Sequence, residues 1–576
     1  MKCRAVYTVV ILIAFSFLAA CGSPAPVQTS AAPGGALTIL LPTTKPASSA
    51  SQVTTRSEEC TIGDAMGNAT TDGRPISWKN RDEYSGPVHF INYVTVSGGT
   101  YGILGMGYDY PFDVKMGVND AGLSLQNSLC DNMTGTESYQ DFKMFALTQM
   151  GSIAELRQAI IEDTNGEVNH WDSEPAICAG FSDAHGYATL FELQQRTYSG
   201  LTYYEYDPTN PLRLTQFPKQ IIARSNTAHL NSDGLDDTSG DIYYTVARDD
   251  LVYYANNTNL NIKNWVKYIA RHGQPNVDDL PNNNATRAVM LVHGVNDGED
   301  PRIVTAWVGL GNPDYTIVVP AWAAQKSDLS SRVTSGGSTS IGAISDQLFH
   351  KNDYHSYDQY INGLFGPVEN NIFEAVEAAR SHWFSSGFNL SEATRIHKEA
   401  AETAWQTMNS MNAGSGRSLN TPPNLIEIIP SIDGLQVSFD LTANDSDGSI
   451  TAYDWDFGDG NASSVSSPVH SYASAGTYLV RARAVDNDGA RNSKWIYVTV
   501  GPGWRTPTPT ATETATTTPT ATSTATPTQT ATRTATPTQT ATKTATTTPT
   551  LTATPTRVVF NLAMPLIWWH GGDWKP

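Results

Sequence analysis

Cysteines and metal-binding patterns are scarce in this sequence. The chain has 576 residues but only five cysteines, Cys3, Cys21, Cys60, Cys130 and Cys178. Their spacing gives no Cys-x-x-Cys pair, and the chain has no His-Glu-x-x-His motif. We therefore expect no bound metal and no cofactor.

Basic residues are also scarce. Lys and Arg together number 36 against 56 Asp and Glu, which gives a formal net charge of −20. A nucleic-acid binder needs a basic surface, so this balance argues against nucleic acid as a partner and for a soluble, surface-exposed protein. The acidic residues are spread along the chain and identify no partner.

The chain lacks a long apolar run of the kind that crosses a membrane. Its N-terminal apolar run, Val6 to Leu18, is too short to span comfortably, since a span takes about 20 residues. Lys2 and Arg4 precede this run, and Leu-Ala-Ala-Cys ending at Cys21 follows it. This order predicts a bacterial lipoprotein-type signal peptide with lipid attached to Cys21. A plain secretory signal cut just before Cys21 is the alternative, and both place the mature protein outside the cytoplasm.

Export matters for two of the other cysteines. Oxidising compartments allow disulfides, so Cys130 and Cys178 can pair in an exported protein. Two free, buried thiols are the alternative for this pair.

Composition divides the chain into segments. The segments 22–59 and 502–557 are rich in Ser, Ala, Pro and Thr, and such sequence has too few apolar residues to form a core. Pro422-Pro423 marks the boundary between the two globular domains. We expect a signal peptide (1–21), a linker or propeptide (22–59), a globular domain (60–415), a second domain (422–501), a Thr/Pro/Ala-rich stalk (502–557) and a short apolar tail (558–576).

Residues 60–415 combine strand and helix patterns. Apolar runs separated by turn residues predict strand pairs at Pro87–Val96 and Tyr101–Gly107, within Met116–Asn127, at Ala176–Phe181 and Tyr187–Leu193, and at Ile303–Trp307 and Tyr315–Val319. Helical spacing predicts helices after a capping box at Ser152, over Asn370–Arg380 and over Ser391–Met411. Hairpins with helices before and after them favour a layered α+β fold.

Cys60 has a setting that suggests catalysis. A thiol at neutral pH is mostly protonated, so a catalytic cysteine needs a nearby base. If Cys60 were the first residue of the mature chain, its own α-amine, titrating at about 7.7–8.0, would serve as that base. Asp82 can orient this amine, and Asn127 and Asn226 can donate hydrogen bonds to a substrate oxygen. A structural cysteine beside an ordinary Asp-Gly turn is the alternative.

The motifs behind Cys60 resemble a known family. The sequence reads Cys-Thr at 60, Asp-Gly at 72, Trp-Lys-Asn-Arg-Asp from 78, Gly-Val-Asn-Asp-Ala-Gly-Leu-Ser-Leu-Gln-Asn ending at 127, Arg-Ser-Asn from 224 and Trp-Val-Gly-Leu-Gly-Asn-Pro-Asp from 307. Over roughly residues 60–350 this set resembles the N-terminal-nucleophile hydrolases of the choloylglycine hydrolase, penicillin V acylase and isopenicillin N acyltransferase group, closest to the branch acting on linear amides.

This resemblance has implications for fold and chemistry. It implies a four-layer αββα sandwich, self-cleavage between Glu59 and Cys60, and hydrolysis or acyl transfer at a non-peptide C–N amide bond through a thioester. By position it makes Cys60 the nucleophile and Asp82 the residue that holds the new amine. It also makes Asn127 the oxyanion-hole asparagine, and it places Asn226, the second asparagine, near the substrate carbonyl.

Several positions depart from the bile-salt branch of that family. Lys79 stands where those enzymes place an arginine, and Arg81 follows two residues later. Lys donates hydrogen bonds from a single ammonium nitrogen, whereas the planar guanidinium of Arg can donate two in parallel, so the two residues are not interchangeable. The spacing from Asn119 to Asn127 is also shorter, and both differences argue against a bile-salt substrate. Arg287 is a candidate for the family's later arginine, or else a surface charge at a strand edge.

Residues 422–501 carry a second resemblance. Trp-Asp-Phe-Gly-Asp-Gly from Trp455 to Gly460, with the Gly-Thr-Tyr from Gly476, is similar to a PKD domain, an immunoglobulin-like β-sandwich. Alternation places Trp455 and Phe457 on one face of a strand, toward the core. The resemblance implies a spacer or a binder of protein or carbohydrate. We interpret its aspartates as solvated turn residues, with calcium ligation as the alternative.

Three hypotheses about function follow. The first is an exported, self-processing cysteine amidohydrolase or acyltransferase that acts on a small-molecule amide and is held at the membrane or cell wall by its lipid anchor or tail. The second is a non-catalytic surface protein that binds through its PKD domain and stalk. The third is a papain-like enzyme with an internal Cys60 and a histidine such as His89 or His229.

Overall fold

The computed structural model describes residues 60–83, 88–108, 113–130, 133, 140–164, 176–195, 201–209, 219–228, 242–271, 281–283, 285–351, 358–413 and 419–506. The predicted signal peptide, linker and tail and nearly all of the predicted stalk lie outside these residues, as do Cys21 and Glu59. No helix in the described part of the chain is long and apolar enough to cross a membrane.

A six-stranded antiparallel sheet contains Cys60. In spatial order its strands are β10 (Gln220–Arg224), β1 (Cys60–Met66), β2 (Ile76–Asp82), β11 (Thr286–His293), β12 (Thr305–Leu310) and β13 (Val319–Ala321). Every residue of β1 and β2 is buried. Both faces of these strands are therefore covered, which explains why their sequences lack the apolar–polar alternation of a half-exposed strand.

A seven-stranded antiparallel sheet follows the chain in order. Its strands are β3 (Phe90–Val94), β4 (Ile103–Tyr108), β5 (Asp113–Asn119), β6 (Ser124–Leu129), β7 (Ala176–Ser182), β8 (Ala188–Gln195) and β9 (Leu201–Tyr206). Asn119 Oδ1 forms the β5–β6 turn by accepting from the backbone N–H groups of Ala121 and Leu123, each at 3.0 Å. Gly122 in this turn has φ +84°, which other residues rarely adopt. The predicted strand, turn and strand within Met116–Asn127 are therefore confirmed.

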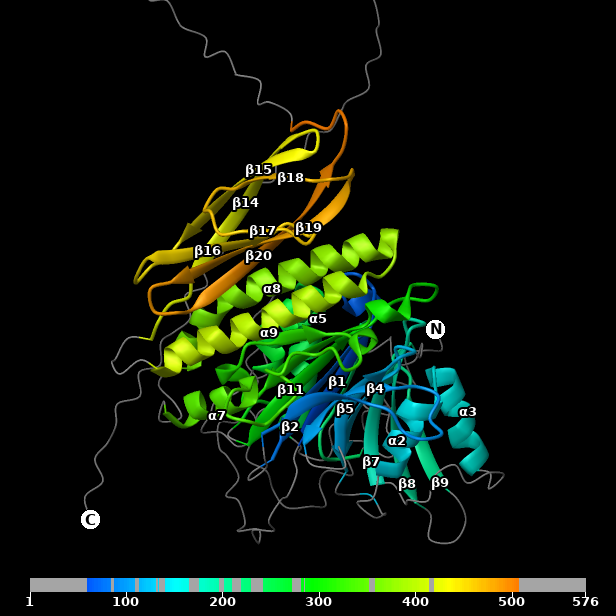
Figure 1. The fold of residues 1–576 in the computed structure, drawn as a ribbon. Coiled ribbons are helices and arrows are strands. Elements are labelled where there is room, and N and C mark those ends of the chain that lie inside the picture. The colour runs from blue at the N-terminus through cyan, green and yellow to red at the C-terminus, as the bar shows by residue number, and fades with distance from the viewer. Residues whose placement is uncertain are drawn as a thin grey trace, which may run out of the picture. The chain divides into compact units, whose positions relative to one another are not determined.

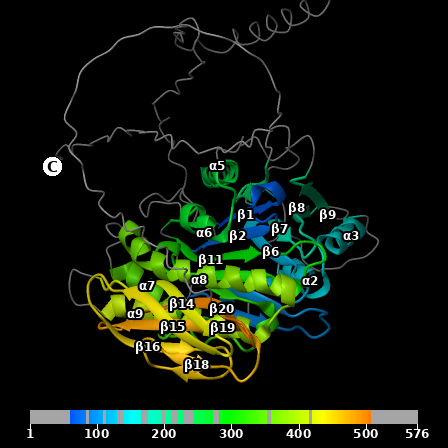
Figure 2. The same ribbon diagram turned by 90° about the horizontal axis from the view of Figure 1, so that it is seen from above.

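The two sheets pack face to face, and helices cover their outer faces (Figure 1; from above in Figure 2). β1 and β2 contact β6 and β7 across the interface. The seven-stranded sheet is covered by α2 (Gln140–Gln149) and α3 (Ile153–Thr164). The six-stranded sheet is covered by α5 (Ile242–Asn257), α6 (Ile262–Trp265), α7 (Ile341–Lys351), α8 (Asp358–Ser386) and α9 (Leu390–Ala413). The mixed helix-and-sheet fold class is confirmed.

Two sequence-based boundaries in this domain were wrong. The segment Tyr315–Val319 is not a strand, because Asn312 caps a 3₁₀ turn over Pro313–Tyr315 and pairing with β12 starts only at Val319. The helix predicted over Asn370–Arg380 is far longer, since α8 begins at Asp358 and runs past Pro367 to Ser386. Its apolar face is buried along much of its length, and tertiary packing of this kind outweighs the local preference against proline.

The C-terminal described segment is a β-sandwich. One sheet has the order β14 (Asn424–Asp433), β15 (Gln436–Asn444) and β18 (Val469–Ser471). The other has the order β17 (Ala462–Ser463), β16 (Ile450–Asp456), β19 (Gly476–Asp486) and β20 (Arg491–Val500). As predicted, Trp455 and Phe457 are buried between the sheets. Gly458 has φ +82°, and a Cβ there would lie 2.6 Å from the Leu479 carbonyl oxygen, so the turn after Phe457 requires glycine.

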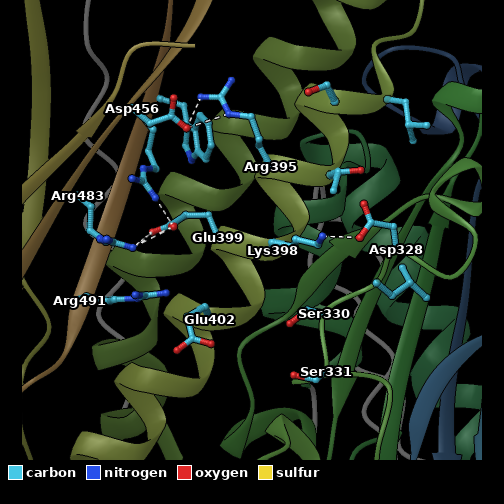
Figure 3. Close-up of a pocket in the computed structure, with 16 residues that line it drawn as sticks. Asp328, Ser330, Ser331, Arg395, Lys398, Glu399, Glu402, Asp456, Arg483 and Arg491 are labelled. Atoms are coloured by element: carbon cyan, nitrogen blue, oxygen red, sulfur yellow. Dashed lines mark hydrogen bonds and ion pairs between the residues drawn. The ribbon is translucent and has the colours of Figure 1, made fainter. Parts of the chain in front are cut away.

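Ion pairs join the sandwich to helix α9 (Figure 3). Glu399 of α9 is buried and accepts from Arg481 and Arg483 of β19 and, at 2.5 Å, from Ser493 of β20. Arg395 of α9 binds Asp456 of β16 at 2.8 Å. Burial alone raises the pKa of Glu399, but the arginines beside it outweigh burial and lower it.

Replacing Glu399 by glutamine should loosen the sandwich from α9. Two arginines lose a buried counter-charge while Asp454 still binds both, so we expect a loss of roughly 1–3 kcal/mol in unfolding free energy. Because the pKa of Glu399 is lowered from 4.5, its contribution is present above about pH 4.5 and is lost as the pH falls further. Thermal unfolding and limited proteolysis between residues 413 and 424 check the loss. Glu402→Gln, whose carboxylate binds Arg332 instead, is the matched control, and an equal effect of both changes would contradict the prediction.

Candidate active site

Cys60 begins strand β1 in the interior of the protein. It is 5% exposed and is the one free cysteine among the described residues. Antiparallel pairing places it directly opposite Arg81 of β2. β10 pairs along the other edge of β1, which brings the residues that follow Arg224 to the same end of the strand. The predicted nucleophile therefore lies where β10, β1 and β2 are side by side.

Asn226 and Ser128 hold the backbone of Cys60. The Cys60 N–H donates to Asn226 Oδ1 at 3.1 Å, although the two residues are 166 positions apart. The Ser128 hydroxyl lies 2.7 Å from the same Oδ1 and 3.1 Å from the Cys60 carbonyl oxygen. Since Oδ1 receives both hydrogen bonds, the Asn226 amino group points elsewhere, where none of the described residues accepts a hydrogen bond from it.

Two cations share the face of the sheet on which the Cys60 side chain lies. Alternate residues of a strand point the same way, so Lys79 and Arg81 of β2 both face the seven-stranded sheet. Arg81 Nη1 is 3.7 Å from Cys60 Sγ. Lys79 Nζ donates to the backbone carbonyl of Asn127. Both side chains are fully enclosed, at 1% exposure or less.

The structure does not bring the Asn127 side chain together with Cys60. In β6 the side chains of Ser124, Gln126 and Ser128 point into the space between the sheets. The pleat therefore turns Asn127 to the opposite face, where its neighbour Leu125 packs under α2 and α3. Only the carbonyl of Asn127 reaches the nucleophile's side, through Lys79.

Asp82 lies one residue beyond the position opposite Cys60. Its carboxylate accepts from Thr286 Oγ1 at 2.7 Å and from Asn283 Nδ2 at 2.8 Å. Both bonds fix the carboxylate at the end of β2. Asp82 thus lies one residue past the pairing partner of Cys60, on the strand face opposite to Arg81.

Sequence reasoning missed several residues of this site, among them Ser128, Thr286, Asn283 and Glu83, whose carboxylate lies 3.3 Å from Arg81 Nη2. Strand alternation from Gln126 could have identified Ser128, because it must share the inward face. Thr286 and Asn283 come from the edge of β11, more than 200 residues after Asp82, and carry no local signal.

The disulfide partners lie beside this site. Cys130 and Cys178 are joined, with their Cα atoms 6.0 Å apart. The bond ties the end of β6 to β7 and packs against Ala228, two residues beyond Asn226. It therefore braces the two segments that carry Ser128 and Asn226.

Arg287 and His89 lie on the far side of Arg81. Arg287 sits at the bulge where β11 shifts its register against β2, and its Nε donates to the Glu83 carbonyl at 3.1 Å. It is thus partly buried and not an exposed strand-edge charge. His89 contacts Glu83 and Tyr108 among the described residues, and His229 lies outside them. Within the described ranges no group of three or more His, Cys, Asp or Glu side chains could hold a metal ion.

A buried carboxyl group lies further along β1. Asp64 Oδ1 accepts from Ser77 Oγ and Gln126 Nε2, each at 2.6 Å. Burial raises the pKa of Asp64 to about 7, although both hydrogen bonds lower it. Its ordinary value is 3.8, so the unfolded chain releases this proton at lower pH than the folded chain does.

The carboxyl group of Asp64 should make stability fall as the pH rises. Between about pH 4 and pH 7 the folded protein binds more protons at Asp64 than the unfolded chain, so its unfolding free energy declines across this window. Asp64→Asn removes the effect and should be more stable than the parent at pH 8 by up to roughly 4 kcal/mol, with little difference near pH 4. Denaturant unfolding at both pH values measures this difference. Parallel pH profiles for parent and variant would contradict it; Asp297→Asn, at an exposed side chain, is the control.

Comparison with solved structures gives likenesses to separate parts of the chain. A conjugated bile acid hydrolase from Clostridium perfringens is 14% identical and covers 46% of this chain and 93% of its own, with a TM-score of 0.30. A Caenorhabditis elegans ortholog of N-acylethanolamine-hydrolyzing acid amidase is 17% identical and covers 41% of this chain and 94% of its own, with a TM-score of 0.28. The PKD1 domain of Vibrio anguillarum Epp is 36% identical over 14% of this chain and 98% of its own, with a TM-score of 0.14.

Comparison with curated proteins concerns the C-terminal β-sandwich. The pre-pro-metalloprotease PrtV of Vibrio cholerae serotype O1 is 43% identical over 58 residues, which is 10% of this chain and 6% of that protein. Collagenase ColA of Clostridium perfringens is 42% identical over 60 residues, 10% of this chain and 5% of the collagenase. The chain thus spans only a small part of these relatives. The family profile of the PKD domain matches residues 421–500, and this segment of the chain is a PKD domain.

Proposed function

We propose that residues 60–415 form an N-terminal-nucleophile amidohydrolase or acyltransferase with a four-layer αββα sandwich. One observation carries the proposal: Cys60 starts a buried strand with its N–H bound by Asn226 and its thiol beside Arg81. Packing alone would not require a hydrogen bond between the Cys60 backbone and the Asn226 side chain, or a guanidinium beside the Cys60 sulfur.

The proposed reaction begins with self-cleavage. The Cys60 thiol attacks the Glu59 carbonyl carbon, the acyl group moves from nitrogen to sulfur, and water hydrolyses the thioester. The products are a carboxylate at Glu59 and a free α-amine at Cys60. Asp82, held by Thr286 and Asn283, then lies beside the new amine and orients it.

The processed enzyme repeats this chemistry on a substrate. The α-amine takes the thiol proton as sulfur attacks the amide carbonyl, and the Asn226 amino group donates to the developing oxyanion. The amine then returns the proton to the leaving nitrogen, which departs as a free amine. Water, or a second amine in a transferase, attacks the thioester and restores the thiol. Arg81 stabilises negative charge on sulfur, and Lys79 fixes the Asn127 segment.

N-terminal sequencing and intact mass of the exported protein test this proposal. We expect a mature chain that begins at Cys60 and cleaves at least one small-molecule amide. An active protein in which Cys60 stays internal would favour a cysteine–histidine enzyme instead. A chain that neither processes nor cleaves amides would leave the surface-binding function, for which the PKD domain is the evidence.

We also propose a location outside the cytoplasm. The signal sequence predicts export, and the curated relatives that share the PKD domain are a pre-pro-metalloprotease and a collagenase. If Cys21 is lipidated and the chain is then cut before Cys60, the anchor leaves the enzyme. Attachment then depends on residues 507–576 or on retention of the cleaved segment, and deletion of residues 507–576 with cell fractionation distinguishes the two.

A further inference from the structure

Three neighbouring strands place a row of side chains against the segment that carries Asn226. Strand register sets Ser128 of β6 directly opposite Cys178 of β7, and Cys178 directly opposite Glu192 of β8. Residues that lie directly opposite each other in a sheet point to the same face. Ser128 contacts Cys60 of the other sheet, so all three side chains of the row point into the space between the sheets.

Two members of this row contact alternate positions of the segment. Glu192 accepts from Arg224 Nε at 2.8 Å, and both side chains are fully buried. Ser128 Oγ lies 2.7 Å from the carboxamide oxygen of Asn226. The ladder between β10 and β1 ends at the pair Ile62 and Arg224. Asn226 lies beyond that ladder, so its position depends on side-chain contacts of this kind.

The disulfide supplies the contact on the other side of Asn226. Cys130 and Cys178 are joined and are 4% and 0% exposed. Both pack against Ala228, which is two residues past Asn226. Cys130 is also two residues past Ser128, so the same bond limits movement of the strand end that carries the Ser128 hydroxyl. Asn226 therefore lies between a buried ion pair on one side and a covalent cross-link on the other.

We propose that the Cys130–Cys178 disulfide positions Asn226 as the oxyanion donor, so that the enzyme reaches full activity only after these two thiols have been oxidised. A donor acts only where it meets the developing charge, and a misplacement of about 1 Å can cost roughly 100-fold in rate. Cys130 and Cys178 are thus positioning residues. This inference rests on the proposed amidohydrolase or acyltransferase function.

The oxidation is a thiol–disulfide exchange. The two thiols lose two protons and two electrons to a disulfide oxidant such as oxidised glutathione, which leaves as two thiols, and a bond forms between the two cysteine sulfurs. Both cysteines are buried in the folded protein, so the exchange takes place before the two sheets close over them. A chain folded under reducing conditions would lack the bond and be slow, whereas an exported chain would acquire it.

Replacing both cysteines by alanine, as Cys130→Ala with Cys178→Ala, tests the inference in the full-length protein. We expect kcat on an amide that the parent cleaves to fall by roughly 10- to 100-fold, and KM to change by less than about threefold, because an oxyanion donor acts on the transition state. Rates are expressed per chain that begins at Cys60, counted by intact mass. An unchanged kcat would overturn the inference.

A double-mutant cycle separates positioning of Asn226 from a general loss of structure. The two alanine changes are combined with Asn226→Asp, which already lacks the amino group. If the disulfide acts through Asn226, its removal should lower kcat of this variant by less than about threefold. A decrease as large as the one in the parent background would show that the bond acts elsewhere and would overturn the inference.

Glu399→Gln is the matched control for lost stability. Removal of a disulfide lowers the unfolding temperature. Glu399→Gln should lower it as well, because Arg481 and Arg483 lose a buried counter-charge between α9 and the β-sandwich, but it should leave kcat as it was. If this control lost as much kcat as the disulfide variant, lower stability would explain both results and the inference would be wrong.

Reduction of the parent covers the case in which the variant fails to fold. Dithiothreitol in mild denaturant opens the bond and leaves both sulfurs in the chain, and alkylation after full unfolding counts the free thiols among Cys60, Cys130 and Cys178. Back in native buffer, the reduced chain should show the lowered kcat. Oxidised glutathione should restore it, with intact mass confirming that no adduct remains on Cys60. Equal kcat in the two forms would contradict the inference.

Hydrogen exchange separates failure of the inference from failure of the proposed function, because it needs no activity. Backbone amides of residues 225–228 should exchange at least about threefold faster without the disulfide, while those of β11 should keep their rates. Such a change in a chain without amidase activity would support the positioning of Asn226 while refuting the proposed function. An active enzyme with unchanged kcat and unchanged exchange would refute the inference alone.

Discussion

Replacing Cys60 by alanine should leave the chain uncut before residue 60 and reduce amide turnover by roughly 10⁴-fold or more. The sulfur is proposed to attack twice, first at Glu59 and then at the substrate, and alanine supplies neither attack. The substitution removes one buried atom, and Cys60 is held chiefly through its backbone by Asn226 and Ser128, so the fold should survive.

Three measurements check this prediction. Intact mass should show a single uncut species for Cys60→Ala and Cys60→Ser, and a cut species for the parent. Thermal unfolding of Cys60→Ala should match that of the equally uncut Cys60→Ser, which separates lost chemistry from lost structure. A Cys60→Ala chain that is still cut at the same bond, or that still hydrolyses the amide, would place the nucleophile elsewhere.

Replacing Asn226 by aspartate should lower kcat by roughly 10²- to 10³-fold. Aspartate keeps an oxygen for the Cys60 N–H and for Ser128 but loses the amino group that the structure leaves available for the oxyanion. It also places negative charge where charge develops in the transition state. Because the loss falls on the transition state, kcat and kcat/KM should drop together.

Ser128→Ala is the matched variant for this prediction. It removes the hydroxyl that contacts Asn226 Oδ1 and the Cys60 carbonyl but leaves the donor in place. We expect a smaller decrease, about 5- to 10-fold, because the carboxamide loses one of the two contacts that orient it. A kcat within about threefold of the parent in Asn226→Asp would show that this side chain is not the oxyanion donor.

Much of the candidate site could be predicted from spaced motifs. Cys60, Lys79, Arg81 and Asn226 were all predicted from their place in the sequence. The structure brings Asn226 and Arg81 into contact with Cys60 and places Lys79 on the same strand face as Arg81. Asn127 shows the limit of this approach. A motif gives the position of a residue, but the pleat of β6 decides which way its side chain points, and it points away from Cys60.

The PKD domain is a case in which local sequence was sufficient. Trp455, Phe457 and Gly458 lie within four residues, and their burial and turn geometry depend mainly on one strand and its turn. The contact of this domain with α9 could not be foreseen in the same way. Glu399 and Arg481 are 82 residues apart, and each by itself looks like an ordinary surface charge.

The sequence alone was sufficient to identify the mixed helix-and-sheet class, the PKD domain and the cysteine on which the proposed chemistry depends. It also predicts an export signal. These features follow from composition, short motifs and periodicity, which act over a few residues. Tertiary structure alone decided the Asn226–Ser128 clamp and the support of Asp82 by Thr286. Each of these depends on strand register and on the packing of two sheets, and pairing between distant strands leaves no local trace in the chain.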